Sequence, residues 1–195
     1  MPPFMTKEKI IIIGVGNVLR RDDGVGVHVA KALEMRISEC GMRNNVIARS
    51  VSDEAISCNL KDEIASPLAR NDKSSKISIY DGGLGGFKLV DLIGGAKQAI
   101  FIDAIDMGLP PGTVKAFLPQ EAASLLAAQK CSLHNSDLLD VIKFVGAYCN
   151  TPLPDNAPEI KIVGVQPANV EPGLELSVSV KDSIPRTVQL ILDII

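Results

Sequence analysis

The stretch that decides the fold is residues 11–29, IIIGVGNVLRRDDGVGVHV. It opens with an isoleucine run that is too short for a helix and β-branched enough for a buried parallel strand. Gly14 and Gly16 then allow a tight loop, and Asn17 suits such a turn. A helix is expected to follow from about residue 22 to residue 38. This order is typical of an open α/β sheet, in which ligands bind beyond the carboxyl ends of the strands.

Asp22 and Asp23 lie where this helix is expected to begin, and a helix N-terminus favours negative charge. One of the two acids can serve as the N-cap, but a single cap leaves the second acid unexplained. A dinucleotide site is disfavoured because Leu19 stands where the fingerprint requires its third glycine. The acids would also repel a phosphate at this position. A cation site is the interpretation that the pair favours.

The composition describes one soluble globular domain. The chain has 195 residues, 46% of them hydrophobic, and a net charge of −3, so it can bury a core and lacks the basic excess of a nucleic-acid-binding protein. No apolar stretch has the length of a membrane span, and residues 1–8 do not resemble a signal peptide. The four cysteines form no CxxC pair, which indicates reduced thiols. We therefore expect a cytoplasmic protein.

Strand and helix patterns alternate along the chain. Strands are predicted at about 8–14, 77–80, 98–104, 113–118 and 160–165, and helices at about 22–38, 87–93, from 119 onward, 138–148 and 178–195. Residues 41–76 are predicted to be an inserted surface excursion with a candidate short strand at 46–47, and residues 166–174 a loop rich in Pro and Gly. The alternation predicts a single domain over residues 1–195. Its expected architecture is a three-layer α/β/α sandwich with a mostly parallel, twisted sheet of about five strands.

Three acids follow predicted strands: Asp23, Asp81 and Asp103. The carboxyl ends of parallel strands share one edge, so these side chains can converge there. Each acid alone is explained by a cap or a turn, but three at one edge weaken a purely structural explanation. His134, in a polar loop before a predicted helix, completes an O,O,N donor set that suits Ni²⁺ or Zn²⁺. Cys131 is a rival ligand, although a core position explains it more simply.

Five blocks of the sequence resemble the hydrogenase maturation proteases. They are GVGNVLRRDDGVG at 14–26, DGG at 81–83, IDAIDMGLPPG at 102–112, LHNSDLLDVI at 133–142 and VGVQPANVEPGLELS at 163–177. The blocks follow the expected order over nearly the whole chain, and together they are specific. The closest resemblance is to the hydrogenase 3 type, which processes the large subunit of energy-conserving, membrane-bound or formate-linked [NiFe] hydrogenases.

The resemblance implies a cytoplasmic, aspartic-type or metal-dependent endopeptidase. It removes a C-terminal extension from a [NiFe] hydrogenase large-subunit precursor after nickel insertion, and the precursor is expected to present the nickel. The implied nickel contacts fall on Asp23, Asp103 and His134. Asp23 occupies a position that holds Glu or Asp in the family. The supporting residues are expected to be Gly16, Asn17, Asp22 and Asp81. We expect no nucleic-acid partner, no membrane insertion and a monomer.

Two mechanisms fit these residues. In the first, a bound metal with open positions activates a water for attack on the scissile carbonyl. In the second, which we favour, the metal belongs to the precursor and is sensed before cleavage, while Asp23 or Asp103 handles the water. The sequence has no HExxH motif, and no Ser or Cys nucleophile stands beside a His with a third orienting group.

Two other classes of function stay open from the sequence. A non-catalytic nickel-binding accessory module would use Asp23, Asp103 and His134 and cut nothing. A nucleotide-binding α/β enzyme is less favoured, because it would place phosphate beside the acids at the first helix.

Overall fold

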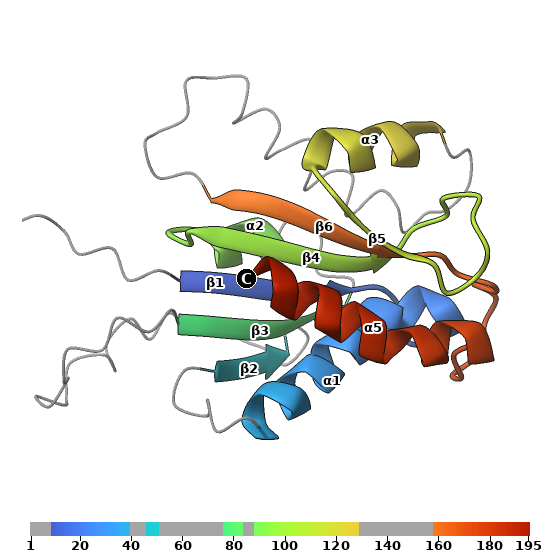
Figure 1. The fold of residues 1–195 in the computed structure, drawn as a ribbon, viewed down its shortest axis with the longest axis horizontal. Helices are drawn as coiled ribbons and strands as arrows, with labels where there is room; N and C mark the ends of the chain where they lie inside the picture. The colour runs from blue at the N-terminus through green and yellow to red at the C-terminus, as the bar shows by residue number, and fades with distance from the viewer. Residues whose placement is uncertain (1–8, 40–45, 51–75, 84–87, 129–157) are drawn as a thin grey trace, which may run out of the picture.

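The computed structural model describes residues 9–39, 46–50, 76–83, 88–128 and 158–195 (Figure 1). These residues form one six-stranded sheet in the order β2-β3-β1-β4-β6-β5. The strands are β1 Lys9–Val15, β2 Val46–Ser50, β3 Lys76–Gly83, β4 Gln98–Ala104, β5 Val114–Phe117 and β6 Glu159–Val165. The helices are the 3₁₀ helix η1 Arg21–Gly24, α1 Val25–Glu39, α2 Lys88–Ile93, α3 Pro119–Ala128 and α5 Val178–Ile194.

The sheet is parallel except for β5, which pairs antiparallel with β6 at one edge. β1 lies in the middle, between β3 and β4. After β1 the chain continues to β2 and β3 on one side, and after β4 it continues to β5 and β6 on the other side. The strand order therefore reverses between β1 and β4, and the crevice beyond the carboxyl ends of such a strand pair is where open α/β sheets bind ligands.

Apolar cores cover both faces of the sheet. Consecutive residues of a strand point to opposite faces, so the isoleucine run of β1 serves both cores. Ile12 belongs to the core with α1 and α5, whereas Ile11 belongs to the core with α2 and α3. In Figure 1, α5 (red) crosses the near face of the sheet. The predicted three-layer α/β/α architecture is confirmed.

The sheet has one strand more than the predicted number of about five. The additional strand is β2 at the edge of the sheet, and it lies at the candidate short strand of residues 46–47 within the predicted excursion. The other parts of that excursion, residues 41–45 and 51–75, and the predicted helix at 138–148 lie outside the described residues. Among the helices that the structure describes, none is both long and apolar enough to cross a membrane.

The first α-helix begins at Val25, later than predicted, because η1 occupies the preceding turn. Gly14 lies inside β1, which runs one residue beyond the predicted end of the strand. A Cβ on Gly14 would overlap the carbonyl of Gly26, and a Cβ on Gly26 would overlap the carbonyl oxygens of Val15 and Ile102. Two glycines therefore let α1 begin directly against the ends of β1 and β4.

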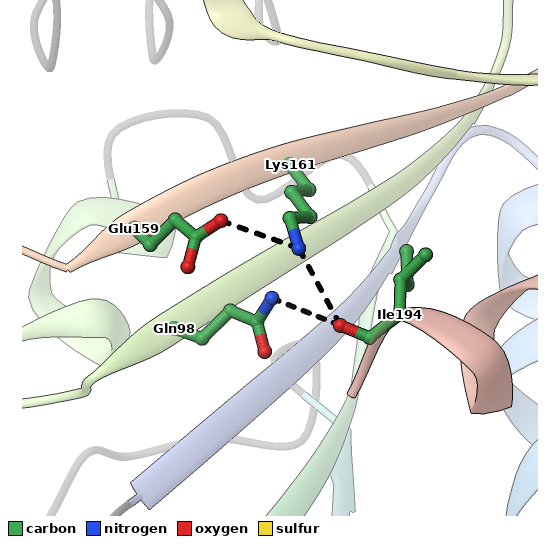
Figure 2. A network of polar contacts seen from close by, with 4 residues as sticks. All are labelled: Gln98, Glu159, Lys161 and Ile194. Atoms are coloured by element: carbon green, nitrogen blue, oxygen red, sulfur yellow. Dashed lines mark hydrogen bonds and ion pairs between the residues drawn. The ribbon is translucent and has the colours of Figure 1, made fainter.

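At the amino edge of the sheet, side chains of β4 and β6 hold the end of α5 (Figure 2). The carbonyl oxygen of Ile194 accepts hydrogen bonds from Gln98 Nε2 at 3.2 Å and from Lys161 Nζ at 3.5 Å. Lys161 Nζ also lies 3.2 Å from Glu159 Oε1. The last carbonyls of a helix have no partner within the helix, and their partial negative charge favours a cation. This cluster joins the C-terminus of α5 to the sheet.

Candidate functional site

Buried polar side chains gather at the carboxyl edge of the sheet. They include Asp22, Asp23, Asp103 and Gln166, with exposed fractions of 0%, 7%, 5% and 6%. Asp22 and Asp23 follow β1, Asp103 is the penultimate residue of β4, and Gln166 follows β6. Burial of a polar group costs free energy unless hydrogen bonds replace those made to water, so the partners of each side chain indicate its role.

Asp22 links η1 to a distant loop, residues 166–177, which we call the strap. Its Oδ2 accepts hydrogen bonds from the backbone N–H groups of Ala168 and Asn169, each at 2.9 Å. The backbone N–H of Ser177 donates to Oδ1 at 2.6 Å, and the Ser177 hydroxyl donates to Oδ2 at 2.8 Å. Burial raises the pKa of Asp22, but these bonds together outweigh it, and the pKa lies below its ordinary value. Asp22 is therefore a link between two loops and does not act as the helix N-cap.

Asp23 is held by residues that directly follow β1. The backbone N–H of Asn17 donates to Asp23 Oδ2 at 3.1 Å, and the Asn17 side chain accepts a hydrogen bond from the N–H of Leu19 at 2.9 Å. Gly16 has φ +125°, and a Cβ on it would overlap the carbonyl oxygen of Asp23. The structure thus brings the predicted supporting residues Gly16 and Asn17 into contact with Asp23.

Asp103 lies near the carboxyl end of β4. Ile102 and Ala104 belong to the core with α1 and α5, so by strand alternation Asp103 faces the side of α2 and α3. Its Oδ1 accepts a hydrogen bond from the backbone N–H of Ala104 at 2.8 Å. Ile102 pairs with Gly14 of β1, and Asp103 comes one residue later. Asp103 therefore lies in β4 next to the point where the chain leaves β1 for the loop that carries Asp23.

Gln166 holds the loop that follows β4. Its Oε1 accepts hydrogen bonds from the N–H groups of Met107 at 2.6 Å and Leu109 at 3.2 Å. Its Nε2 donates to Asp106 Oδ1 at 2.9 Å, and the N–H of Gly108 donates to the same oxygen at 3.0 Å. The hydrogen bond from Gln166, followed by that from Gly108, lowers the pKa of Asp106. One buried side chain therefore fixes several backbone groups of an irregular loop.

The linking role of the strap was not predicted. In the sequence, residues 163–177 carry one of the blocks that resemble the family, but nothing in that block names its partners. The hydrogen bonds of Asp22 join residues about 150 positions apart, such as Ala168 at a separation of 146. The sequence shows a Gln directly after a predicted strand, but the burial that marks this side chain as a link is known only from the fold.

Asp81 lies at the same edge but on the other face of the sheet. Ile77 and Ile79 of β3 belong to the core with α1 and α5, so by alternation Asp81 faces α1. Its Oδ2 lies 3.6 Å from Lys31 Nζ of α1 in an ion pair, and Lys31 is 61% exposed. The supporting role of Asp81 at the site stays a prediction.

The third predicted nickel contact, His134, and its rival Cys131 lie outside the described residues. In the part of the chain that the structure describes, no three His, Cys, Asp or Glu side chains are grouped so that they could hold a metal ion. The two predicted oxygen donors, Asp23 and Asp103, both lie at the carboxyl edge of the sheet. The complete set stays a prediction.

A family model described as hydrogenase maturation protease matches residues 63–194. The chain belongs to the hydrogenase maturation protease family. The matched range begins before β3 and ends with α5, so it includes Asp103 and the strap. The closer resemblance to the hydrogenase 3 type stays a prediction.

Individual members of the family match over almost the whole chain. The hydrogenase expression/formation protein HupD of Thiocapsa roseopersicina is 28% identical over 186 residues, which are 95% of this chain and 66% of that protein. The chain thus spans about two thirds of the length of this relative.

Solved structures of maturation proteases share the fold. The hydrogenase maturating endopeptidase HybD from E. coli aligns with a TM-score of 0.62 at 24% identity, over 95% of this chain and 90% of that one. The [NiFe] hydrogenase maturation protease HybD from Thermococcus kodakarensis aligns with a TM-score of 0.61 at 22% identity, over 95% and 98%. At these identities the likeness shows the fold alone.

Proposed function

We propose that this chain is an endopeptidase that removes the C-terminal extension of a [NiFe] hydrogenase large-subunit precursor after nickel insertion. The observation that carries the proposal concerns β1 and β4, the two strands between which the strand order reverses. Asp23 follows β1, and Asp103 is the penultimate residue of β4. Both side chains are buried, with 7% and 5% exposed. Membership of the hydrogenase maturation protease family supports peptidase chemistry at this place.

In this proposal nickel is part of the substrate and is recognised by Asp23, Asp103 and His134. Two carboxylates and an imidazole are donors that suit a borderline divalent ion. In the chain, His134 follows α3, and α3 belongs to the core on the face toward which Asp103 points. Recognition of the nickel would make cleavage conditional on a loaded precursor.

The carboxylates also supply the chemistry that hydrolysis needs. A carboxylate within hydrogen-bond reach of a water can accept its proton while the water attacks a peptide carbonyl. Backbone N–H donors fix one oxygen of each acid, from Asn17 to Asp23 and from Ala104 to Asp103. We assign the handling of the water to one of these two acids, whose geometry is set by the backbone before the substrate arrives.

The test is cleavage of a purified precursor, in nickel-loaded and nickel-free forms, followed by mass spectrometry of its C-terminus. The unmodified chain should shorten the loaded form only, and Asp103→Asn should be slower by about 100-fold or more. The matched control is Asp193→Asn, an exposed acid of α5 that accepts a hydrogen bond from Gln189, and it should cleave normally. A normal rate with Asp103→Asn would contradict the proposal.

The same assay separates the alternatives. A nickel-binding accessory module would bind the loaded precursor and leave its length unchanged. A nucleotide-binding enzyme is disfavoured by the structure, because Asp22 and Asp23 are buried in the turn before α1, where a phosphate would have to lie.

A further inference from the structure

We infer that the strap, residues 166–177, is the positioning element of the site and holds the loops of both candidate carboxylates. It does so through two buried side chains, Asp22 and Gln166. Neither is proposed to touch the reacting atoms, so both are positioning residues. The kinetic part of this inference rests on the proposed function, whereas its structural part does not.

The first connection runs from the strap to the loop that carries Asp23. Besides the bonds of the Asp22 side chain, hydrogen bonds run in both directions between the two segments. They are Arg21 N to Gly173 O at 2.8 Å, Asp22 N to Asn169 O at 3.1 Å, Gly173 N to Leu19 O at 2.9 Å and Arg20 Nε to Val170 O at 3.0 Å. Asp22 and Asp23 are consecutive, so a shift of the strap reaches Asp23 through one peptide bond.

The second connection runs from the strap to the loop after Asp103. Gln166 binds the N–H groups of Met107 and Leu109 through its side chain. Its backbone also pairs with the far end of that loop, where Gly112 N donates to Gln166 O at 2.9 Å. The loop is thus fixed near both of its ends by one residue of the strap.

Asp22 and Gln166 each present the hydrogen-bond donors and acceptors that their partners require, and similar residue types do not. Both oxygens of Asp22 accept from N–H or O–H donors, so an Asn would turn its NH₂ group toward other donors. The side chain of Gln166 accepts hydrogen bonds with its oxygen and donates one with its nitrogen. A Glu at this position would place a second carboxylate against Asp106. A Met would leave the backbone N–H groups of Met107 and Leu109 without this acceptor. The linking function therefore depends on these side chains and not on apolar packing.

The amino edge of the sheet offers a matched control. Gln98 is 7% exposed, close to the 6% of Gln166, and it also binds backbone, donating to Ile194 O. Gln166→Met and Gln98→Met therefore remove the same polar group from similar burial at opposite edges. Ser177→Ala tests the Asp22 connection without removing the buried charge, and Ser177→Thr should restore it by returning the hydroxyl.

The experiment measures amide hydrogen exchange, melting temperature and precursor-processing kinetics for these variants. Gln166→Met should speed exchange at Met107 and Leu109, and Ser177→Ala should speed exchange at Asn17, whose N–H binds Asp23. Both should lower kcat, Gln166→Met by about tenfold or more, with KM within about twofold, because misplaced groups slow the chemical step. Gln98→Met should change neither these amides nor kcat.

The inference is wrong if Gln166→Met and Gln98→Met change kcat equally at the same loss of melting temperature, since the effect would then be one of stability. It is also wrong if exchange at Asn17 is unchanged in Ser177→Ala and exchange at Met107 and Leu109 is unchanged in Gln166→Met. Should the unmodified chain cleave no precursor, the proposed function fails, and the exchange rates still decide whether the strap holds the two loops.

Discussion

The two edges of the sheet each bury a glutamine, and they use it differently. At the amino edge, Gln98 binds the last turn of α5 together with Lys161, so the polar cluster completes a regular element (Figure 2). At the carboxyl edge, Gln166 binds an irregular loop that would otherwise have few partners for its backbone. Similar burial of the same residue type thus joins a helix end to the sheet in one place and fixes an irregular loop in the other.

The charges of the two edges differ in the same way. The amino edge sets a lysine against the partial negative charge of a helix C-terminus and against Glu159, which is a favourable arrangement. The carboxyl edge holds the buried acids Asp22, Asp23 and Asp103, which lose hydration on burial. Backbone N–H donors offset part of this cost, and acids kept together at such a cost are typical of functional sites.

The largest effect is expected from removing the charge of Asp22. Asp22→Asn turns an NH₂ group toward donors of the strap, and we expect it to lower the free energy of unfolding by about 3 kcal/mol. Urea unfolding measures the difference. The exposed control Asp193→Asn should change the free energy by less than about 0.5 kcal/mol. A loss below about 1 kcal/mol for Asp22→Asn would show that the strap is held mainly by its other contacts.

A smaller loss of stability at the same carboxyl edge is expected when the pH is lowered. The pKa of Asp22 in the folded chain lies below its ordinary value of 3.8. Its contribution to stability is therefore fully present above that value and is lost as pH falls through the folded pKa. Melting temperatures measured from about pH 5 down to about pH 2, through and below the ordinary carboxyl pKa of about 4, should fall more steeply for the unmodified chain than for Asp22→Asn. Parallel curves would mean that Asp22 does not contribute to the acid sensitivity.

The smallest effect is expected at the amino edge. Lys161→Met removes a cation from the C-terminus of α5 but leaves the hydrogen bond of Gln98, so the expected loss is about 0.5–1 kcal/mol. Lys181→Met, in the first turns of the same helix, should cause no loss because a cation is not favoured there. Precursor processing should be normal in both variants. Slower processing by Lys161→Met would show that the two edges are coupled.

The sequence alone predicted the parts of this protein that depend on local pattern. Uninterrupted apolar runs set the extents of β1 and β4 within a residue or so, because a buried parallel strand needs apolar side chains on both faces. The turn at Gly16 was predicted because a positive φ strongly favours glycine. Alternating strands and helices predicted the layers, and the sequence blocks indicated the family that the family model confirms.

The tertiary structure alone decided which residues work together. That Asp81 faces α1 while Asp103 faces α2 and α3 depends on strand alternation counted from the real pairing register. That Asp22 and Gln166 both serve the strap depends on the strand order, which brings the loops after β1, β4 and β6 to one edge. A hydrogen bond between residues about 150 positions apart leaves no periodic trace in the sequence, because its geometry exists only once the sheet has formed.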